Sequence, residues 1–224
     1  MLMPVVVATL VAFVAAAPCT TIAPVGVGLP STVTADSTLN ALFASGADFR
    51  AFLAEARARR AQWIQNSAAA VIAPDVLAVA RALPGHWRLL VSAVDSCSDS
   101  VNTVPYLARL VELVPELEMR IVLPAAGKPI MESHRTPDGR PATPTVVVLD
   151  EAGNDVGCWV ERPAFLQSRA IAARGAGLMD QFAKEKQSLY DADAGTSTVR
   201  EVVAVLQAAA AGKPRCDAGP SPLP

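Results

Sequence analysis

The chain has 224 residues, a formal net charge of -2 and a hydrophobic content of 52%, with only 5% aromatic residues. This length is enough for one or two domains with a sizeable buried core. The small net charge argues against a broad basic surface of the kind that binds nucleic acid. Outside the N-terminus, no run reaches the roughly 18 apolar residues that a membrane-spanning helix needs.

The N-terminus is the most apolar part of the sequence. Residues 1–17 contain an unbroken apolar run and include Val14-Ala15-Ala16, a small-residue site typical of signal peptide cleavage. They predict a signal peptide and an exported, periplasmic or extracytoplasmic protein, which would touch a membrane only through an uncleaved segment. The alternative is an apolar strand or helix of a cytoplasmic protein. Lipidation at Cys19 is disfavoured because Pro18 occupies the position where a small residue is expected.

A linker and a helical region follow. Residues 18–37 are rich in Pro, Gly, Ser and Thr without periodicity, which predicts a linker. Residues 38–83 predict a helical extension, with an amphipathic part broken near Gly46 and a further helix that starts at Pro74 and stops at Pro84-Gly85. Two helices are thus expected before the first strand.

The next stretch predicts a strand that runs into a cysteine and then into a helix. Residues 88–94 form an apolar, β-branched run of strand length, and apolar residues recur at helical spacing from Val101 onward. Cys97 lies between them. At a helix N-terminus, the macrodipole and unpaired backbone N–H groups favour a thiolate over a thiol. Cys97 is therefore the candidate nucleophile, and a plain buried cysteine is the alternative.

The rest of the chain alternates strands and helices. The expected elements are a strand at 117–123, a short helix at 130–135, strands at 146–149 and 155–160 joined by a turn at 151–154, and helices at 165–190 and 196–211. This order predicts an α/β fold with a central mixed sheet flanked by helices. Residues 168–212 form the C-terminal helices, and the Pro-rich residues 213–224 are expected to be a disordered tail.

Two motifs at this spacing resemble the thioredoxin-like superfamily, in particular its bacterial members. Cys97-Ser98-Asp99-Ser100 opens a helix after a strand, and Thr143-Pro144-Thr145 leads into a strand. The resemblance covers roughly residues 83–166 and implies a thioredoxin-like core at 84–167. It also implies that Cys97 attacks disulfides, that Pro144 is cis and faces this cysteine, and that backbone groups beside Pro144 hold a client strand.

The chain departs from that family at two positions. Ser96 replaces the Trp that usually precedes the cysteine, and Ser100 replaces the second, resolving cysteine. A Cys-x-x-Ser site can form a mixed disulfide but cannot release it by the usual internal attack. Two functions follow: thiol–disulfide exchange at a single cysteine with an external thiol as reductant, or a redox-inactive module for binding or folding assistance.

Polar residues near Cys97 complete the candidate site. Ser100 either donates a hydrogen bond to the thiolate or caps the helix, and is grouped with Cys97 and Pro144 as catalytic. Asp99 matches a position that is often acidic in this branch of the family, but a first-turn Asp is favourable on any helix. If ionised, Asp95 and Asp99 would oppose the thiolate. The residues expected to contact a substrate are Ser96, Ser98, Asp99 and Thr143.

Three further cysteines have no fixed partners. Cys158, in the last strand, is interpreted as a small core residue. The alternative is that it replaces the missing resolving thiol, which would need its Cα within about 7 Å of that of Cys97. Cys19 and Cys216 lie in the two ends of the chain and could pair with each other, or with a partner, in an oxidising compartment. Sequence does not choose among the three full pairings that four cysteines allow.

The remaining motifs predict neither a metal nor a cofactor. His86 and His134 have no cysteine or second histidine at metal-ligand spacing, and a hydrolase pair of His134 with Cys97 has only formal support. No phosphate-binding Gly-rich loop, nucleophile elbow or dinucleotide fingerprint occurs. The expected partners are a client protein or a small-molecule disulfide, and an external thiol reductant.

Overall fold

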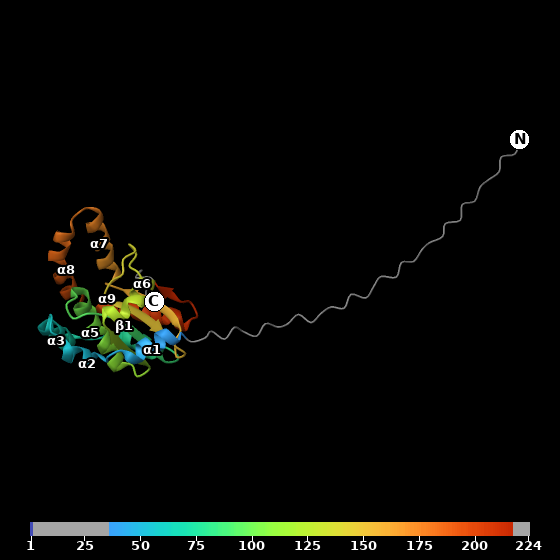
Figure 1. The fold of residues 1–224 in the computed structure, drawn as a ribbon, viewed down its shortest axis with the longest axis horizontal. Helices are drawn as coiled ribbons and strands as arrows, with labels where there is room; N and C mark the ends of the chain where they lie inside the picture. Colours follow the sequence, from blue (N-terminus) through green and yellow to red (C-terminus); the bar gives the residue numbers. More distant parts are fainter. Residues whose placement is uncertain (2–35, 217–224) are drawn as a thin grey trace. The chain divides into compact units, whose positions relative to one another are not determined.

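The computed structural model describes residue 1 and residues 36–216, so that the predicted signal peptide, most of the predicted linker and Cys19 fall outside the described residues. Within residues 36–216 the centre is a five-stranded sheet in the order β2-β1-β3-β4-β5 (Figure 1). β1 is parallel to β2 and β4 is parallel to β5, whereas β3 is antiparallel to both β1 and β4. The strands are β1 (Trp87–Ser92), β2 (Leu117–Val122), β3 (Thr145–Leu149), β4 (Asp155–Val160) and β5 (Arg215–Cys216). The predicted α/β fold with a mixed sheet is confirmed.

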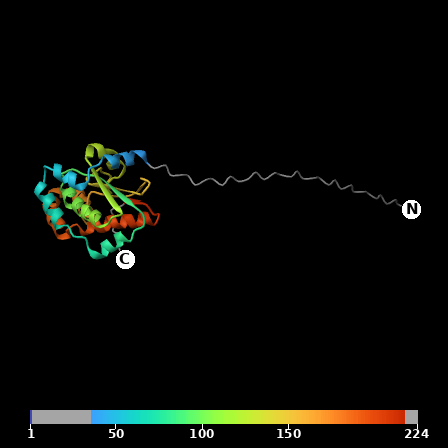
Figure 2. The ribbon, with the colours of Figure 1, turned by 90° about the horizontal axis from the view of Figure 1, so that it is seen from below.

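Helices cover both faces of this sheet. Alternate residues along a strand face opposite sides, so Leu89 joins a larger core under α5 and α9, whereas Leu90 joins a smaller core with Phe43 of α1 and Ile130 of α6. Figure 2 shows α1 and α6 on one side of the sheet and α9 on the other. The bounds of these helices are α1 (Ser37–Ser45), α5 (Ser98–Leu113), α6 (Pro124–Ser133) and α9 (Thr196–Ala210).

Between residues 36 and 86 the chain forms four helices, whereas the sequence predicted two. They are α1, α2 (Phe49–Glu55), α3 (Arg60–Ala69) and α4 (Pro74–Arg81). The predicted break at Gly46 separates α1 from α2. The unexpected break between α2 and α3 has a tertiary cause, because the N–H groups of Arg57 and Ala58 donate to the carboxylate of Asp95 at 2.7 and 2.8 Å. Arg59 then turns the chain with a left-handed φ of 50°.

Helix α6 begins earlier than predicted, at Pro124 and not near residue 130. The sequence predicts only a short helix at 130–135 within this stretch, because it is rich in Pro, Gly and charge. Proline is tolerated at the first position of a helix, and a side chain at Gly127 would collide with Ser92, so glycine lets α6 lie against β1.

The helix predicted at 165–190 is two helices, α7 (Ala164–Gly175) and α8 (Met179–Asp193), which form a hairpin at the upper left of Figure 1. The chain turns between them at Gly177, whose φ of 71° is accessible to glycine at little cost. Leu166 and Ala170 of α7 pack on Phe182 and Tyr190 of α8.

The expectation of disorder from residue 213 is wrong for the described part of the tail. Arg215 and Cys216 form β5, which pairs with Gly157 and Cys158 of β4. A disulfide between Cys158 and Cys216 supplies the physical reason, because it fixes the tail to the sheet covalently. Residues 217–224 lie outside the described residues.

No single helix in the described part of the chain is both long and apolar enough to cross a membrane. Helices α3 and α4 meet the length and composition criteria only when taken together, and they are bent by 85° at the break between them.

Candidate functional site

Cys97 lies between β1 and α5 and is the N-cap residue of that helix. Its backbone N–H donates to the carbonyl of Val94 at 3.1 Å, and its Sγ accepts a hydrogen bond from the backbone N–H of Ser100 at 3.4 Å. The sulfur therefore takes the position that a Ser, Thr or Asp oxygen usually has at the start of a helix. Among the residues that the structure describes, Cys97 is the only free cysteine, and it is partly exposed.

The Thr143–Pro144 peptide bond lies beside this sulfur and is cis, as the resemblance implies. The Cys97 thiol donates to the carbonyl oxygen of Thr143, with Sγ and O 3.2 Å apart. The carbonyl of Pro144 in turn accepts a hydrogen bond from the N–H of Glu161 at 2.7 Å. The structure therefore brings together the two motifs of the predicted site, which contain Cys97 and Pro144.

Ser100 shows neither of its two predicted roles. Its hydroxyl is buried without a hydrogen-bond partner, and the residue reaches Cys97 through its backbone N–H. The N-cap of α5 is Cys97 and not Ser100. The position that would carry a resolving thiol thus holds a hydroxyl that makes no hydrogen bond to the sulfur.

The carboxylate of Asp95 is committed to the backbone. It accepts hydrogen bonds from the N–H groups of Arg57 and Ala58, and these two bonds, in that order, lower the pKa of the Asp95 carboxyl. Trp63 Nε1 donates to the Asp95 carbonyl at 3.0 Å. Asp95 therefore anchors the α2–α3 connection at the end of β1.

Asp99 is buried, with 6% of its surface exposed, and is surrounded by cations. Its Oδ2 lies 3.1 Å from Arg162 Nη2 and 3.0 Å from Lys186 Nζ, and its Oδ1 accepts a hydrogen bond from the Tyr190 hydroxyl at 2.7 Å. Burial, followed by the charge of Asp99, raises the pKa of Tyr190 well above its ordinary value. Because two cations compensate its charge, Asp99 opposes a thiolate at Cys97 less than an isolated carboxylate would.

A second group of charged side chains lies beside Asp99 and its partners. Glu161 Oε2 is 2.9 Å from Arg140 Nη2, and Arg162 also contacts Glu161. Asp138 pairs with Arg140 Nε at 2.9 Å and with Arg174. Burial alone would raise the pKa of Asp138, but the hydrogen bond from Arg140 and further contacts lower it to about 2. These pairs tie the loop before Pro144 to the end of β4 and to α7.

The sulfur of Cys97 opens onto a cleft of about 400 Å³. The cleft has charged residues on its wall, among them Asp99, Arg140 and Glu161, and an apolar part that includes Met131. An extended polypeptide segment combines polar backbone groups with side chains of both kinds, so a wall of this mixed character suits such a segment.

The predicted substrate contacts are divided between two places. Asp99 and Thr143 line the cleft with Cys97. Ser98 accepts a hydrogen bond from Lys186 Nζ at 2.7 Å and lines a separate polar hollow of about 640 Å³, formed mainly by α3 and α8. Ser96 is exposed, and its carbonyl accepts a hydrogen bond from Arg59 Nε at 2.9 Å.

Sequence reasoning missed the ionic partners of this site. Glu161 and Arg162 carried a local signal, since a charged pair directly follows an apolar strand. Lys186 carried none, because it is 88 residues from Ser98 in sequence and sits in an ordinary amphipathic helix. Arg140 lies in a stretch rich in Pro, Gly and charge, whose pattern indicates no particular partner.

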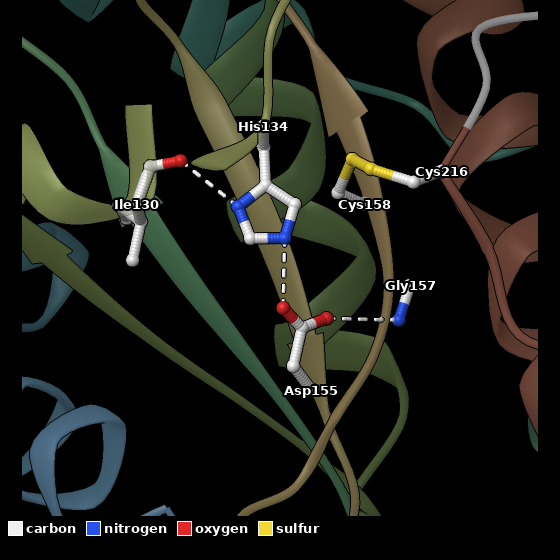
Figure 3. Close-up of a disulfide and its surroundings, with 6 residues drawn as sticks. All are labelled: Ile130, His134, Asp155, Gly157, Cys158 and Cys216. Atoms are coloured by element: carbon white, nitrogen blue, oxygen red, sulfur yellow. Dashed lines mark hydrogen bonds and ion pairs between the residues drawn. A yellow bond between two sulfur atoms is a disulfide. The ribbon is translucent and has the colours of Figure 1, made fainter. Parts of the chain in front are cut away.

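A second group of reactive side chains lies on the other face of the sheet, the face of the smaller core (Figure 3). Cys158 and Cys216 form a disulfide with Cα atoms 4.4 Å apart. Cys158 is buried, as predicted, but the suggested pairing of Cys19 with Cys216 is wrong, because β5 places Cys216 beside Cys158. The same bond contradicts a resolving role for Cys158 in this state of the protein.

Comparison with known proteins identifies the family. A family model described as Thioredoxin matches residues 46–174, which is more than half of the chain. No curated protein matches. Two solved structures each align with 75% of this chain and 96% of their own: a Pseudomonas aeruginosa protein of unknown function, at 22% identity and a TM-score of 0.58, and an HIV epitope scaffold, at 21% identity and a TM-score of 0.57. These two likenesses show the fold alone. The chain belongs, by its family match, to the thioredoxin family.

Proposed function

We propose that the protein is a thiol–disulfide oxidoreductase that acts through the single nucleophile Cys97. The observation that carries this proposal is the position of Cys97 Sγ: at the start of α5, 3.2 Å from the carbonyl of Thr143 beside the cis bond to Pro144, and on a cleft. A helix N-terminus stabilises a developing thiolate, and a cleft gives a client disulfide access to it.

The proposed reaction has two exchange steps. The Cys97 thiolate attacks one sulfur of a client disulfide, the client S–S bond breaks, and the departing client sulfur leaves as a thiolate that takes up a proton. An external thiolate then attacks the client sulfur of the mixed disulfide. This second attack releases Cys97 as a thiolate and leaves the client joined to the external thiol, so that no net oxidation of the protein occurs.

The ionic groups around the cleft support this chemistry by holding the site in place. Arg162 and Lys186 fix Asp99 in the first turn of α5, and Glu161 donates its N–H to Pro144. These contacts keep the helix start and the loop before Pro144 in position on either side of the sulfur. A preformed geometry of this kind lowers the cost of bringing a client disulfide into line.

Export, predicted from residues 1–17, belongs to the same proposal. The Cys158–Cys216 disulfide supports it, because protein disulfides persist mainly in oxidising compartments. Such a compartment also contains the disulfide-bonded clients that Cys97 would attack.

The test is capture of a mixed disulfide by the full chain carrying Cys19→Ser, so that Cys97 is the one cysteine outside the Cys158–Cys216 disulfide. The protein is incubated with oxidised glutathione as a model disulfide, and the adduct is located by mass spectrometry. We expect one glutathione on Cys97, formed faster than on free cysteine at the same pH, and released by added reduced glutathione. The Cys97→Ser variant should form no adduct, whereas the double variant Cys158→Ser, Cys216→Ser should still form one.

One result would count against the proposal. This result is an adduct on Cys97 that forms no faster than on free cysteine. It would favour the alternative function, a thioredoxin-like module that binds clients without exchange. That alternative is supported by Ser100, which provides no second thiol. The Ser100→Cys variant provides a further check, because its two thiols should release the adduct without external thiol and end as an internal disulfide.

A further inference from the structure

The side chains around the Cys158–Cys216 disulfide form a set of metal-ligand types. A ring nitrogen of His134 and the two sulfurs all lie within 4.8 Å of one another. Asp155 Oδ2 lies 2.7 Å from His134 Nε2, and Figure 3 shows this carboxylate below the imidazole ring and the disulfide to the right of the ring. The four groups come from α6, β4 and β5, so only the fold brings them together.

The backbone would keep the two sulfurs close together even if the disulfide were opened. Cys158 and Cys216 are directly paired residues of the parallel strands β4 and β5. Directly paired residues on neighbouring strands point to the same face of a sheet. Opening the disulfide would therefore leave two thiols side by side on the His134 face, as long as β5 keeps its place.

The ring of His134 is oriented as a ligand would be. Its Nδ1 lies 2.9 Å from the carbonyl oxygen of Ile130, and because a carbonyl only accepts, Nδ1 carries the hydrogen. The other nitrogen, Nε2, then faces the carboxylate of Asp155, whose second oxygen accepts from the N–H of Gly157 at 3.3 Å. A histidine that donates one ring N–H to a backbone carbonyl and turns the other nitrogen inward has the outer support typical of metal-bound histidines.

We propose that the reduced form of the chain binds a thiophilic divalent cation, with Zn²⁺ as the best match, through Cys158, Cys216 and His134 Nε2. Asp155 completes a tetrahedral set of two sulfurs, one nitrogen and one oxygen, the donor types that zinc prefers. Two sulfurs bound to one tetrahedral zinc are about 3.8 Å apart, given Zn–S bonds of about 2.3 Å. The sulfurs reach this separation by side-chain rotation after the disulfide opens.

The disulfide is converted to a metal site in two steps. A dithiol reductant reduces the Cys158–Cys216 bond to two thiols and is itself oxidised to a disulfide. Zn²⁺ then binds the two sulfurs and Nε2, which releases the two thiol protons and the proton held between His134 and Asp155. Disulfide and metal are thus alternative ways of fastening β5 to β4, one for the oxidised chain and one for the reduced chain.

The test is a Co²⁺ titration of the full chain carrying Cys19→Ser and Cys97→Ser, so that only this cysteine pair can supply thiolates. The protein is reduced with dithiothreitol, desalted without oxygen and titrated with Co²⁺, which replaces zinc and absorbs visible light when bound to thiolates. We expect one equivalent of Co²⁺ with a sulfur-to-cobalt charge-transfer band, loss of the band on addition of Zn²⁺, and no band in the oxidised protein.

Two histidine variants distinguish binding of Co²⁺ at this site from binding of Co²⁺ to any exposed histidine. His134→Gln should weaken Co²⁺ binding by about tenfold to a hundredfold or more, the range seen when metal-site groups are removed, whereas the exposed control His86→Gln should not. In the wild-type chain, Zn²⁺ should slow alkylation of reduced Cys216 and leave that of Cys97 unchanged. Absence of the band, an equal affinity in His134→Gln, or no protection of Cys216 would each overturn the proposal. None of these readouts depends on exchange at Cys97.

Discussion

The two cysteine sites of this protein are built in opposite ways. Cys97 belongs to a contiguous stretch in which a strand, a cysteine and a helix follow one another, and its sulfur is held by the N–H of Ser100 three residues on. The Cys158–Cys216 site joins residues 58 positions apart and takes His134 from a third element. The first site is visible in the sequence as a motif, whereas the second exists only once the sheet has formed.

The largest expected effect concerns Asp99, whose charged partners lie far from it in the sequence. Asp99→Ala should lower the free energy of unfolding by about 3–5 kcal/mol, because it leaves the buried Arg162 and the partly buried Lys186 without their shared carboxylate. Urea unfolding followed by circular dichroism measures this change. Arg109→Ala is the matched control, because its pair with Glu112 is exposed and should contribute less than about 1 kcal/mol. Equal losses in the two variants would mean that the Asp99 pairs add no more stability than a surface pair.

The next effect belongs to the second site. The double variant Cys158→Ser, Cys216→Ser should lower the free energy of unfolding by about 4 kcal/mol, as expected for releasing a loop of 58 residues. Guanidinium unfolding of the oxidised wild type and the variant measures it, with Cys97→Ser as a control that keeps the disulfide. If the double variant also lost glutathione exchange at Cys97, the two sites would not be independent.

A smaller effect concerns the opposite face of β4, where Trp159 donates to Glu201 Oε2 at 2.7 Å. Burial raises the pKa of Glu201 to about 7, against the effect of its hydrogen bonds. The folded protein therefore holds the proton of the Glu201 carboxyl more tightly than the unfolded chain does. The protonated carboxyl contributes fully to the free energy of unfolding below about pH 4.5. This contribution, up to about 3 kcal/mol, is lost as the pH rises to about 7. Unfolding of wild type and Glu201→Gln at a series of pH values measures it, and a wild-type profile no steeper than that of the variant would contradict the assignment.

The smallest effect concerns Ser100. Its hydroxyl is buried without a partner, so Ser100→Ala should change the free energy of unfolding by no more than about 1 kcal/mol and should not be strongly destabilising. The rate of glutathione capture should also stay close to that of wild type, because the contact to Cys97 comes from the backbone. A severalfold loss of capture rate would show instead that the hydroxyl acts on the sulfur, which is one of the two roles that the sequence allows.

The sequence predicted the central strands and the Cys97 motif well because both depend on neighbouring residues. The apolar runs predicted at 88–94, 146–149 and 155–160 correspond to β1, β3 and β4 with small shifts at their ends. The helix start at Cys97 followed from the change of periodicity after β1. The cis bond at Pro144 came from the family resemblance and not from local pattern.

The parts that were not predicted depend on contacts between distant residues. Tyr190 reaches Asp99 from 91 residues away, and Arg162 reaches it from 63 residues away, so no window along the chain contains both partners. The break at Arg57 and Ala58 depends on Asp95 in the same way. The Pro-rich composition of residues 213–224 predicts a disordered tail, and only the pairing with β4 gives Arg215 and Cys216 their structure.

The short strand β5 also covers an edge of the sheet at which a second copy of the chain could pair. It covers Gly157 and Cys158 on the outer side of β4, whose backbone groups would otherwise be open to a strand from another chain. At the opposite side of the sheet, Ala47 exchanges two hydrogen bonds with Ile121 of β2 at 2.8 and 2.9 Å, without a covalent link. Opening the disulfide therefore removes the only covalent link, among the described residues, that holds β5 on this edge. We expect the reduced protein to associate through β4 more readily than the oxidised protein.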